Sequence, residues 1–357
     1  MFQSAWTEKL GIRYPILLAP MAGGPSTPEL VAAVSNAGGL GSVGAGYLKP
    51  DQIRSAIHEI RKLTDRPFGV NLFVPELPDT TDEAAAEMIK HLNTYRTELG
   101  LTPIKELPVV AETFAEQVQV LLDEQVAVFS FTFGIPSKDI LDAMKKKGIT
   151  VIGTATTVEE AKRLEASGID AIVAQGSEAG GHRGTFIGQA EDALIGTMAL
   201  VPQIVDHVSI PVIASGGIMD GRGMAASFAL GAAAVQMGTA FLAAPESGAH
   251  AVYKEKLLTS PEDSTEVTRS YSGKPARGIR TAFMDDMRGY TGTIPAYPIQ
   301  NALTREIRQA AAKANNPELM SLWAGQGLRL ATSREAAAIM EQTIGQAEEL
   351  VKRMSAL

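Results

Sequence analysis

The sequence of 357 residues contains no cysteine. Disulfides, thiolate nucleophiles and cysteine-based metal sites are therefore excluded at once, and the absence fits a cytoplasmic protein. No apolar stretch reaches the ~18 residues that a membrane span needs. The first fifteen residues also lack the basic segment and apolar run of a signal peptide. We expect a cytoplasmic protein that does not enter a membrane, and we assign it no metal site.

Basic residues are also fewer than acidic ones. The chain has 32 Lys and Arg against 40 Asp and Glu, a net charge of −8, and its pI is near 5.3. No basic patch is visible that would neutralise phosphates, so nucleic acid is not an expected partner. The hydrophobic content of 45% and charged content of 20% are ordinary for a globular protein with a sizeable core.

Strand-like and helix-like segments alternate along most of the chain. Short apolar runs are typical of buried parallel strands. Capping signals precede several expected helices, among them Thr27-Pro28-Glu29 and the capping-box patterns of residues 157–160 and 332–335. About eight such units predict a (β/α)₈ barrel of the α/β class, with an open doubly wound sheet as the alternative. The expected strands are residues 15–20, 40–44, 68–73, 126–133, 150–155, 171–174, 211–215 and 233–238.

The chain exceeds one typical barrel of about 250 residues by roughly a hundred. The alternation stops over residues 245–323, which are more polar and favour helices joined by loops. We interpret this stretch as a smaller, mainly helical cap domain over the barrel mouth. The barrel then comprises residues 1–244 and 324–357, and the last helix packs back onto it.

Residues 171–188 hold the strongest candidate for chemistry. A strand-like run is followed by a glycine-rich loop that contains His182. Active sites of these barrels lie on the loops after the strands, and glycines let the backbone approach a ligand closely. His182 is therefore the candidate catalytic residue. Glu178 could orient its ring, although a solvated loop acid is the preferred interpretation, and the other four histidines are assigned to structural or surface roles.

Two further glycine loops follow the seventh and eighth expected strands, at Gly216-Gly217 and Gly238-Thr239. Loops at these places present backbone N–H groups that suit a phosphate. The G-x-G-x-x-G pattern at residues 39–44 is not a dinucleotide fingerprint, because it follows a helix and forms a strand. We therefore expect a ligand with one phosphate beside His182.

Several motifs occur together in this chain: residues 19–24 (Ala-Pro-Met-Ala-Gly-Gly), 69–75, 131–136, 154–157, 174–184 and 297–301 (Tyr-Pro-Ile-Gln-Asn). Together they resemble the nitronate monooxygenases, formerly called 2-nitropropane dioxygenases. The resemblance runs from about residue 12 to the last helix. It implies an FMN-containing barrel with a small cap that oxidises alkyl nitronates, such as propionate 3-nitronate, with O₂ to a carbonyl compound and nitrite.

The resemblance also implies roles for individual residues. His182 matches the active-site histidine. Tyr290 and Tyr297 are candidate substrate contacts on a different ground, because both lie in the stretch that we place over the barrel mouth. The residues implied to bind FMN are Met21, Ala22, Asn71, Gln175, Gly180, Gly217, Gln236, Met237, Gly238 and Thr239.

Two alternatives stay open. FMN-dependent NAD(P)H reductases of the same superfamily, acting on enoyl-acyl-carrier-protein or on quinones, share the barrel and a similar histidine loop. A non-catalytic flavin-binding or phosphate-binding module is the second alternative. Whether the protein is a monomer or a dimer is left open by the sequence.

Overall fold

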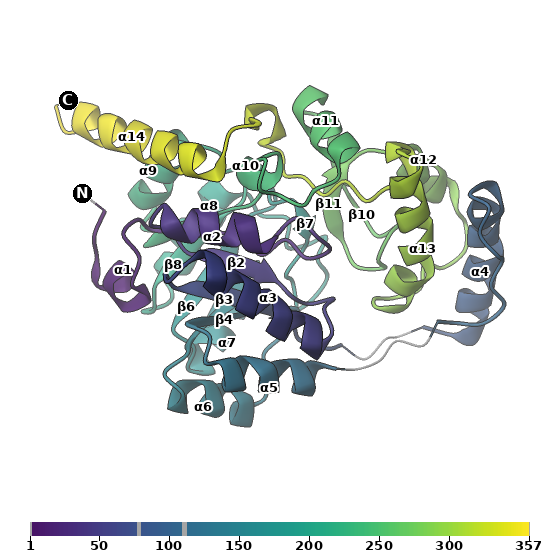
Figure 1. The fold of residues 1–357 in the computed structure, drawn as a ribbon, viewed down its shortest axis with the longest axis horizontal. Coiled ribbons are helices and arrows are strands. Elements are labelled where there is room, and N and C mark those ends of the chain that lie inside the picture. Colours follow the sequence, from purple (N-terminus) through teal and green to yellow (C-terminus); the bar gives the residue numbers. More distant parts are fainter. Residues whose placement is uncertain (1, 77–79, 109–112, 357) are drawn as a thin grey trace.

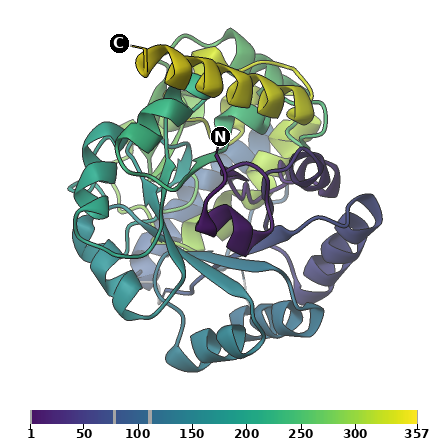
Figure 2. The ribbon, with the colours of Figure 1, turned by 90° about the vertical axis from the view of Figure 1, so that its left-hand side faces the viewer.

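The computed structural model describes residues 2–76, 80–108 and 113–356. Within these ranges eight parallel strands form one sheet, in the order β1-β9-β8-β6-β5-β4-β3-β2. Figure 2 shows them ringed by helices. The strands are β1 (Ile16–Leu18), β2 (Gly41–Gly44), β3 (Phe68–Phe73), β4 (Val128–Thr132), β5 (Thr150–Ala155), β6 (Ala171–Gln175), β8 (Val212–Ser215) and β9 (Ala234–Met237).

The two ends of the sheet meet, which decides between a barrel and an open sheet. Leu17 of β1 bridges to Leu40, just before β2. Leu18 N–H donates to the carbonyl of Leu40 at 2.9 Å, and Leu40 N–H donates to the carbonyl of Ile16 at 2.9 Å. These bonds close the ring, so the predicted (β/α)₈ barrel is confirmed.

The barrel interior is packed and its amino end is covered. Leu17, Val128, Ile152 and Ile213, from four different strands, are at most 2% exposed and form one apolar cluster with Trp6. Trp6 belongs to α1 (Ala5–Leu10), which lies across the end of the barrel in Figure 2. The described residues therefore close the amino end of the barrel, and a ligand site is expected at the opposite end, where the strands finish.

The outer helices mostly begin where the capping signals predict. Thr27 accepts a hydrogen bond from Leu30 N–H at 3.1 Å at the start of α2. The capping box predicted at residues 332–335 is wrong, because the carboxylate of Glu246 accepts the Ala336 N–H at 3.0 Å instead. These helices are α2 (Pro28–Asn36), α3 (Pro50–Leu63), α5 (Phe114–Glu124), α6 (Lys138–Lys146), α7 (Val158–Ala166), α8 (Thr197–Val205), α9 (Gly221–Ala229), α10 (Thr239–Leu242) and α14 (Ala336–Met354).

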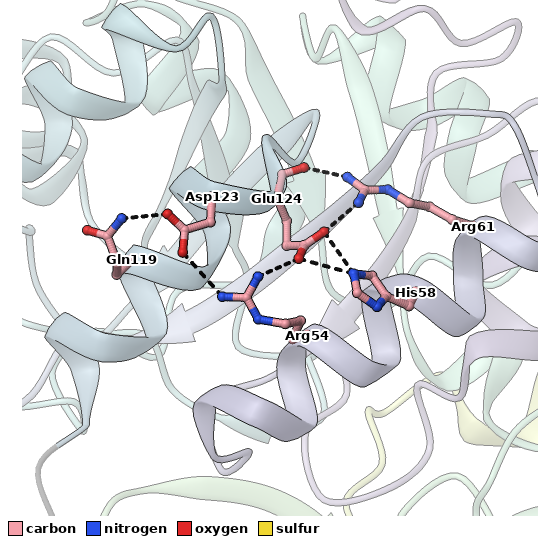
Figure 3. A network of polar contacts seen from close by, with 6 residues as sticks. All are labelled: Arg54, His58, Arg61, Gln119, Asp123 and Glu124. Atoms are coloured by element: carbon pink, nitrogen blue, oxygen red, sulfur yellow. Dashed lines mark hydrogen bonds and ion pairs between the residues drawn. The ribbon is translucent and has the colours of Figure 1, made fainter.

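A charged cluster joins two neighbouring outer helices, α3 and α5 (Figure 3). The carboxylate of Glu124 accepts hydrogen bonds from Arg54 and Arg61, both at 2.6 Å, and lies 3.1 Å from His58 Nε2. Partial burial opposes ionisation, but these partners outweigh it and lower the pKa of Glu124. The cluster therefore links α3 to the end of α5 on the outside of the barrel.

The cap differs from the prediction because it contains a small sheet. β10 (Thr265–Thr268) and β11 (Ala276–Ile279) are antiparallel, and β11 also pairs with β7 (Gly181–His182) from the histidine loop. Sequence patterns predict no strand here, because these runs are short and lack the alternation of a half-buried strand. The cap helices are α11 (Ala251–Thr259), α12 (Ala282–Gly289) and α13 (Ile299–Lys313), with 3₁₀ turns at Pro317–Leu319 and Leu328–Leu330.

Another helix packs with the cap although it lies far earlier in the chain. α4 (Asp82–Glu98) stands beside α12 and α13 in Figure 1. Its Met88 and Leu92 share an apolar cluster with Phe283 and Leu303. The cap boundaries at residues 245–323 stay a prediction. The apolar cluster shows that α4, which lies outside those boundaries, packs with the same residues. No helix in the described ranges is both long and apolar enough to cross a membrane.

Candidate active site

His182 is held by both the barrel and the cap. It lies in β7, where it is opposite Ala276 of β11. The side chain of Gln175, at the end of β6, holds the same segment. The Nε2 of Gln175 donates to the carbonyl of His182 at 3.0 Å, and the Oε1 of Gln175 accepts the N–H of Gly184 at 2.9 Å. The position of the histidine backbone is therefore tied to the end of a barrel strand.

The imidazole of His182 is half-buried at a cavity between barrel and cap. Three aromatic rings surround it: the centroids of Trp323, Phe133 and Tyr297 lie 5.4, 5.8 and 6.3 Å away. Burial, and then the positive charge of Lys274, lower the pKa of His182 to about 3. The ring is therefore neutral near pH 7, with a hydrogen on one nitrogen and a lone pair on the other.

Lys274 ties the cap to the barrel beside the histidine. Its Nζ lies 2.8 Å from a carboxylate oxygen of Glu76, in the loop after β3, and 4.5 Å from the ring centroid of Phe133. Only 11% of the Lys274 side chain is exposed. Sequence reasoning gave these residues no role, because nothing local marks a contact between positions 198 residues apart.

Arg183, which follows the histidine, is a structural anchor with 1% exposure. Its guanidinium donates to the carbonyls of Gly176 at 2.6 Å, Gln175 at 3.0 Å and Ala193 at 3.3 Å. Burial, and then the nearby Arg277, lower the pKa of Arg183 to about 10, so it remains charged at neutral pH. This one side chain ties the end of β6 to the loop beyond the histidine.

Glu160 anchors the other end of the histidine loop and is fully buried. Its carboxylate accepts the N–H groups of Phe186 at 2.5 Å, Ile187 at 2.9 Å and Thr156 at 2.6 Å. The pattern at residues 157–160 correctly predicts that Thr157 caps α7. It fails for Glu160, whose carboxylate accepts the N–H of Thr156, one residue before the cap, and those of a segment 26 residues later, rather than the N–H of Thr157 itself.

A cavity of about 1610 Å³ opens at the carboxyl ends of the strands. Glycines line part of it, and Gly217 has φ +71°, a conformation that favours glycine. A Cβ on Gly180 would lie 2.6 Å from backbone atoms of Ala324 and Gly325. Without side chains in the way, the backbone of Gly216, Gly217 and Gly238 can approach a ligand closely, as phosphate binding requires.

Most predicted site residues meet at this cavity although they come from distant parts of the chain. Their convergence follows from the barrel, because all parallel strands end at the same rim. The predicted residues that line it are Met21, Ala22, Asn71, Gln175, Gly180, His182, Gly217, Gln236, Gly238, Thr239 and Tyr297.

Two predicted residues do not line the cavity. Met237 is 1% exposed and belongs to the apolar core, because successive strand residues face opposite sides and Gln236 faces inward. Tyr290 ends α12 and packs against His91, with 4.8 Å between ring centroids. The structure therefore places neither side chain where it would touch a ligand of this cavity.

Glu178 is neither a solvated loop acid nor a partner of His182. It is half-buried, and its carboxylate accepts the N–H of Thr197 at 2.9 Å and the hydroxyl of the same residue at 2.8 Å. The prediction of a solvated side chain is wrong, because this carboxylate caps the start of α8. The described part of the chain contains no cluster of His, Asp and Glu suited to a metal ion.

The family model described as nitronate monooxygenase matches residues 3–345. The chain belongs to the nitronate monooxygenase family. It is an enzyme of a flavin-dependent oxidoreductase family. A probable nitronate monooxygenase of Staphylococcus haemolyticus (strain JCSC1435) is 49% identical to this chain. The similarity covers 98% of this chain and 98% of that relative.

Two solved structures are similar to this chain over nearly its whole length. A nitroalkane oxidase from Streptomyces ansochromogenes is 40% identical, with a TM-score of 0.91, over 98% of this chain and 100% of that one. FabK from Thermotoga maritima is 34% identical, with a TM-score of 0.79, over 100% of this chain and 99% of that one. The likeness covers the barrel and the cap together.

Proposed function

We propose that this enzyme binds FMN and uses O₂ to oxidise alkyl nitronates, such as propionate 3-nitronate, to a carbonyl compound and nitrite. The observation that carries the proposal is that the neutral, half-buried His182 shares one cavity with the glycine loops at Gly217 and Gly238. A base and a phosphate cradle are thus brought to the same rim of the barrel. The family supports the flavin, and the cavity supports its FMN form.

The residues of the cavity fit FMN. The backbone at Gly217, Gly238 and Thr239 would hold its single phosphate, where a Cβ at position 217 would lie 3.4 Å from Glu178. Asn71 and Gln175 would hold polar edges of the ring system. When bound, FMN supplies the electron acceptor for the oxidation, a role that no protein side chain here can fill.

The remaining residues act on the substrate. The rings of Phe133, Tyr297 and Trp323 form an apolar wall that limits the access of water to the reacting carbon. His182 stands within this wall and can accept a proton from a neutral nitroalkane. The positive charges of Lys274 and Arg308 act on the same place and favour the binding of an anion.

An anaerobic mixing experiment tests the proposal against the reductase alternative. Purified enzyme is mixed with a preformed nitronate and, separately, with NADH, while the flavin absorbance is followed. We expect the nitronate alone to bleach the flavin, and nitrite to accumulate once air is admitted. Rapid bleaching by NADH with no response to nitronates would move the enzyme to the reductase class.

A further inference from the structure

The hydroxyl of Ser272 makes three short polar contacts beneath the active-site ring. Its Oγ lies 2.8 Å from His182 Nε2, 3.0 Å from the carbonyl oxygen of Lys274 and 3.3 Å from the N–H of the same lysine. Ser272 is 1% exposed, so water does not compete for these contacts. The three neighbours together restrict where the protons can lie.

The contacts agree with one proton arrangement. A serine hydroxyl donates one hydrogen bond and accepts two, and the carbonyl of Lys274 can only accept. The Ser272 hydrogen therefore points to that carbonyl, and the oxygen accepts the Lys274 N–H. The contact at 2.8 Å is then a hydrogen bond only if His182 Nε2 carries a proton. If Ser272 instead donated to His182 Nε2, its oxygen and the carbonyl oxygen of Lys274 would face each other at 3.0 Å with no hydrogen between them.

We propose that Ser272 is a positioning residue that holds His182 in the Nε2–H tautomer and thereby presents Nδ1 to the substrate. Among the described residues, Nδ1 has no hydrogen-bond partner, while the ring itself lines the cavity. A neutral imidazole has one protonated and one unprotonated nitrogen, so fixing Nε2–H leaves the lone pair on Nδ1.

The turn that carries Ser272 is well placed to hold a ring still. Lys274, two residues later, is tied to Glu76 on the barrel and lies over the ring of Phe133. Phe133 in turn meets His182 edge to face, with 5.8 Å between centroids. The hydroxyl and one wall of the histidine pocket thus belong to one connected unit.

The consequence for the reaction rests on the proposed function. With a neutral nitroalkane, the C–H bond next to the nitro group breaks and its electron pair stays on the substrate, delocalised onto the nitro oxygens. The proton forms a new bond to Nδ1, and the imidazolium keeps its Nε2–H bond to Ser272. A preformed nitronate has no such proton, so this alignment matters less for it.

Nitrogen NMR of enzyme labelled with [¹⁵N]histidine tests the tautomer directly. The chain has five histidines, and the His182 signals are identified by their loss in His182→Asn. We expect a protonated Nε2 and an unprotonated Nδ1 in the wild type. Ser272→Ala should produce a mixture of both tautomers, while Ser272→Thr, which keeps the hydroxyl, should retain the wild-type form.

Ser270→Ala is the matched control, because Ser270 is also buried in this turn but bonds Thr268 rather than the histidine. Kinetics supply the second measurement. Ser272→Ala should lower kcat/KM for a neutral nitroalkane by about 3- to 10-fold, the effect of one lost hydrogen bond, and change the nitronate reaction less.

The two proposals fail separately. A wild-type signal with the proton on Nδ1 overturns the inference even if nitronates are oxidised as proposed. So does an unchanged tautomer in Ser272→Ala. If Ser272→Ala does not fold, the wild-type spectrum alone decides. If the wild-type enzyme shows the Nε2–H tautomer but does not oxidise nitronates, the proposed function is refuted instead.

Discussion

The side-chain amide of Gln175 donates to the backbone carbonyl of His182 at 3.0 Å. Gln175 ends a barrel strand and lines the cavity, whereas His182 belongs to a strand that pairs with the cap. The contact therefore links the proposed cofactor site to the candidate base. A substitution on either side of the cavity should therefore affect the other side.

His182→Asn should separate the two forms of substrate. If His182 removes a proton, its loss should lower kcat/KM for a neutral nitroalkane by ~10²–10⁴-fold, about 3–5 kcal/mol of barrier. The loss for the corresponding nitronate should be smaller, because that anion has already lost its proton. Asparagine keeps a donor and much of the ring's shape. An equal loss for both forms, at matched flavin content, would mean that the ring only positions the substrate.

The lowered pKa of His182 predicts a dependence of stability on pH. Burial lowers the pKa to about 3, while the unfolded chain titrates near 6.5, so the unfolded state binds the extra proton between these values. The free energy of unfolding should therefore fall as the pH drops from about 6.5 towards 3. Denaturant titrations at several pH values should show a shallower fall in His182→Asn. His207→Asn, at an exposed histidine, is the control and should follow the wild type.

Gly217→Val should yield colourless protein. Gly217 has φ +71° and faces the cavity, so a side chain there strains the backbone and blocks the approach of a phosphate. The measurement is flavin content after purification, with release by acid to distinguish FMN from FAD. Gly148→Val carries the same strain at φ +72°, but no atom lies within 4 Å of its Cβ position. Full flavin in both variants would contradict the placement of the phosphate.

Glu160→Gln should destabilise the enzyme although it removes no ion pair. Both carboxylate oxygens face N–H donors, so one position must receive an NH₂ group that points at a backbone N–H. We expect the free energy of unfolding to drop by about 1–3 kcal/mol, measured by denaturant titration. Glu159→Gln, at the exposed neighbour, should change it far less. Equal effects would show that the Glu160 contacts do not hold the histidine loop.

Local sequence patterns predicted most of the barrel. Buried strands appear as short apolar runs and helix starts as capping residues, and both signals depend on neighbours in the chain. The same reasoning found His182 and the glycine loops, because strand ends converge on one rim in any such barrel. Motif resemblance then supplied the family, which the comparisons show.

The sequence failed wherever a residue's partner is remote. The carboxyl groups of Glu160 and Glu178 were assigned to a capping box and to solvent, yet each binds backbone groups elsewhere in the fold. Strand β11 escapes prediction because its run is short and lacks alternation, and one of its two partners, β7, lies almost a hundred residues away in the histidine loop. Tyr290 is predicted to contact substrate because it lies in the cap stretch. Its actual neighbour, His91, follows from the packing of α12, which the sequence does not reveal.

The sequence by itself therefore determined the architecture, the candidate base and the glycine cradle, since these follow from local composition and a regular repeat. Only the tertiary structure decided the surroundings of His182. Its neutral state comes from burial, its ring is boxed by Phe133, Tyr297 and Trp323, and its Nε2 meets Ser272 from the cap. A pKa and a tautomer depend on which groups are brought together in space, and those contacts join residues that no local pattern connects.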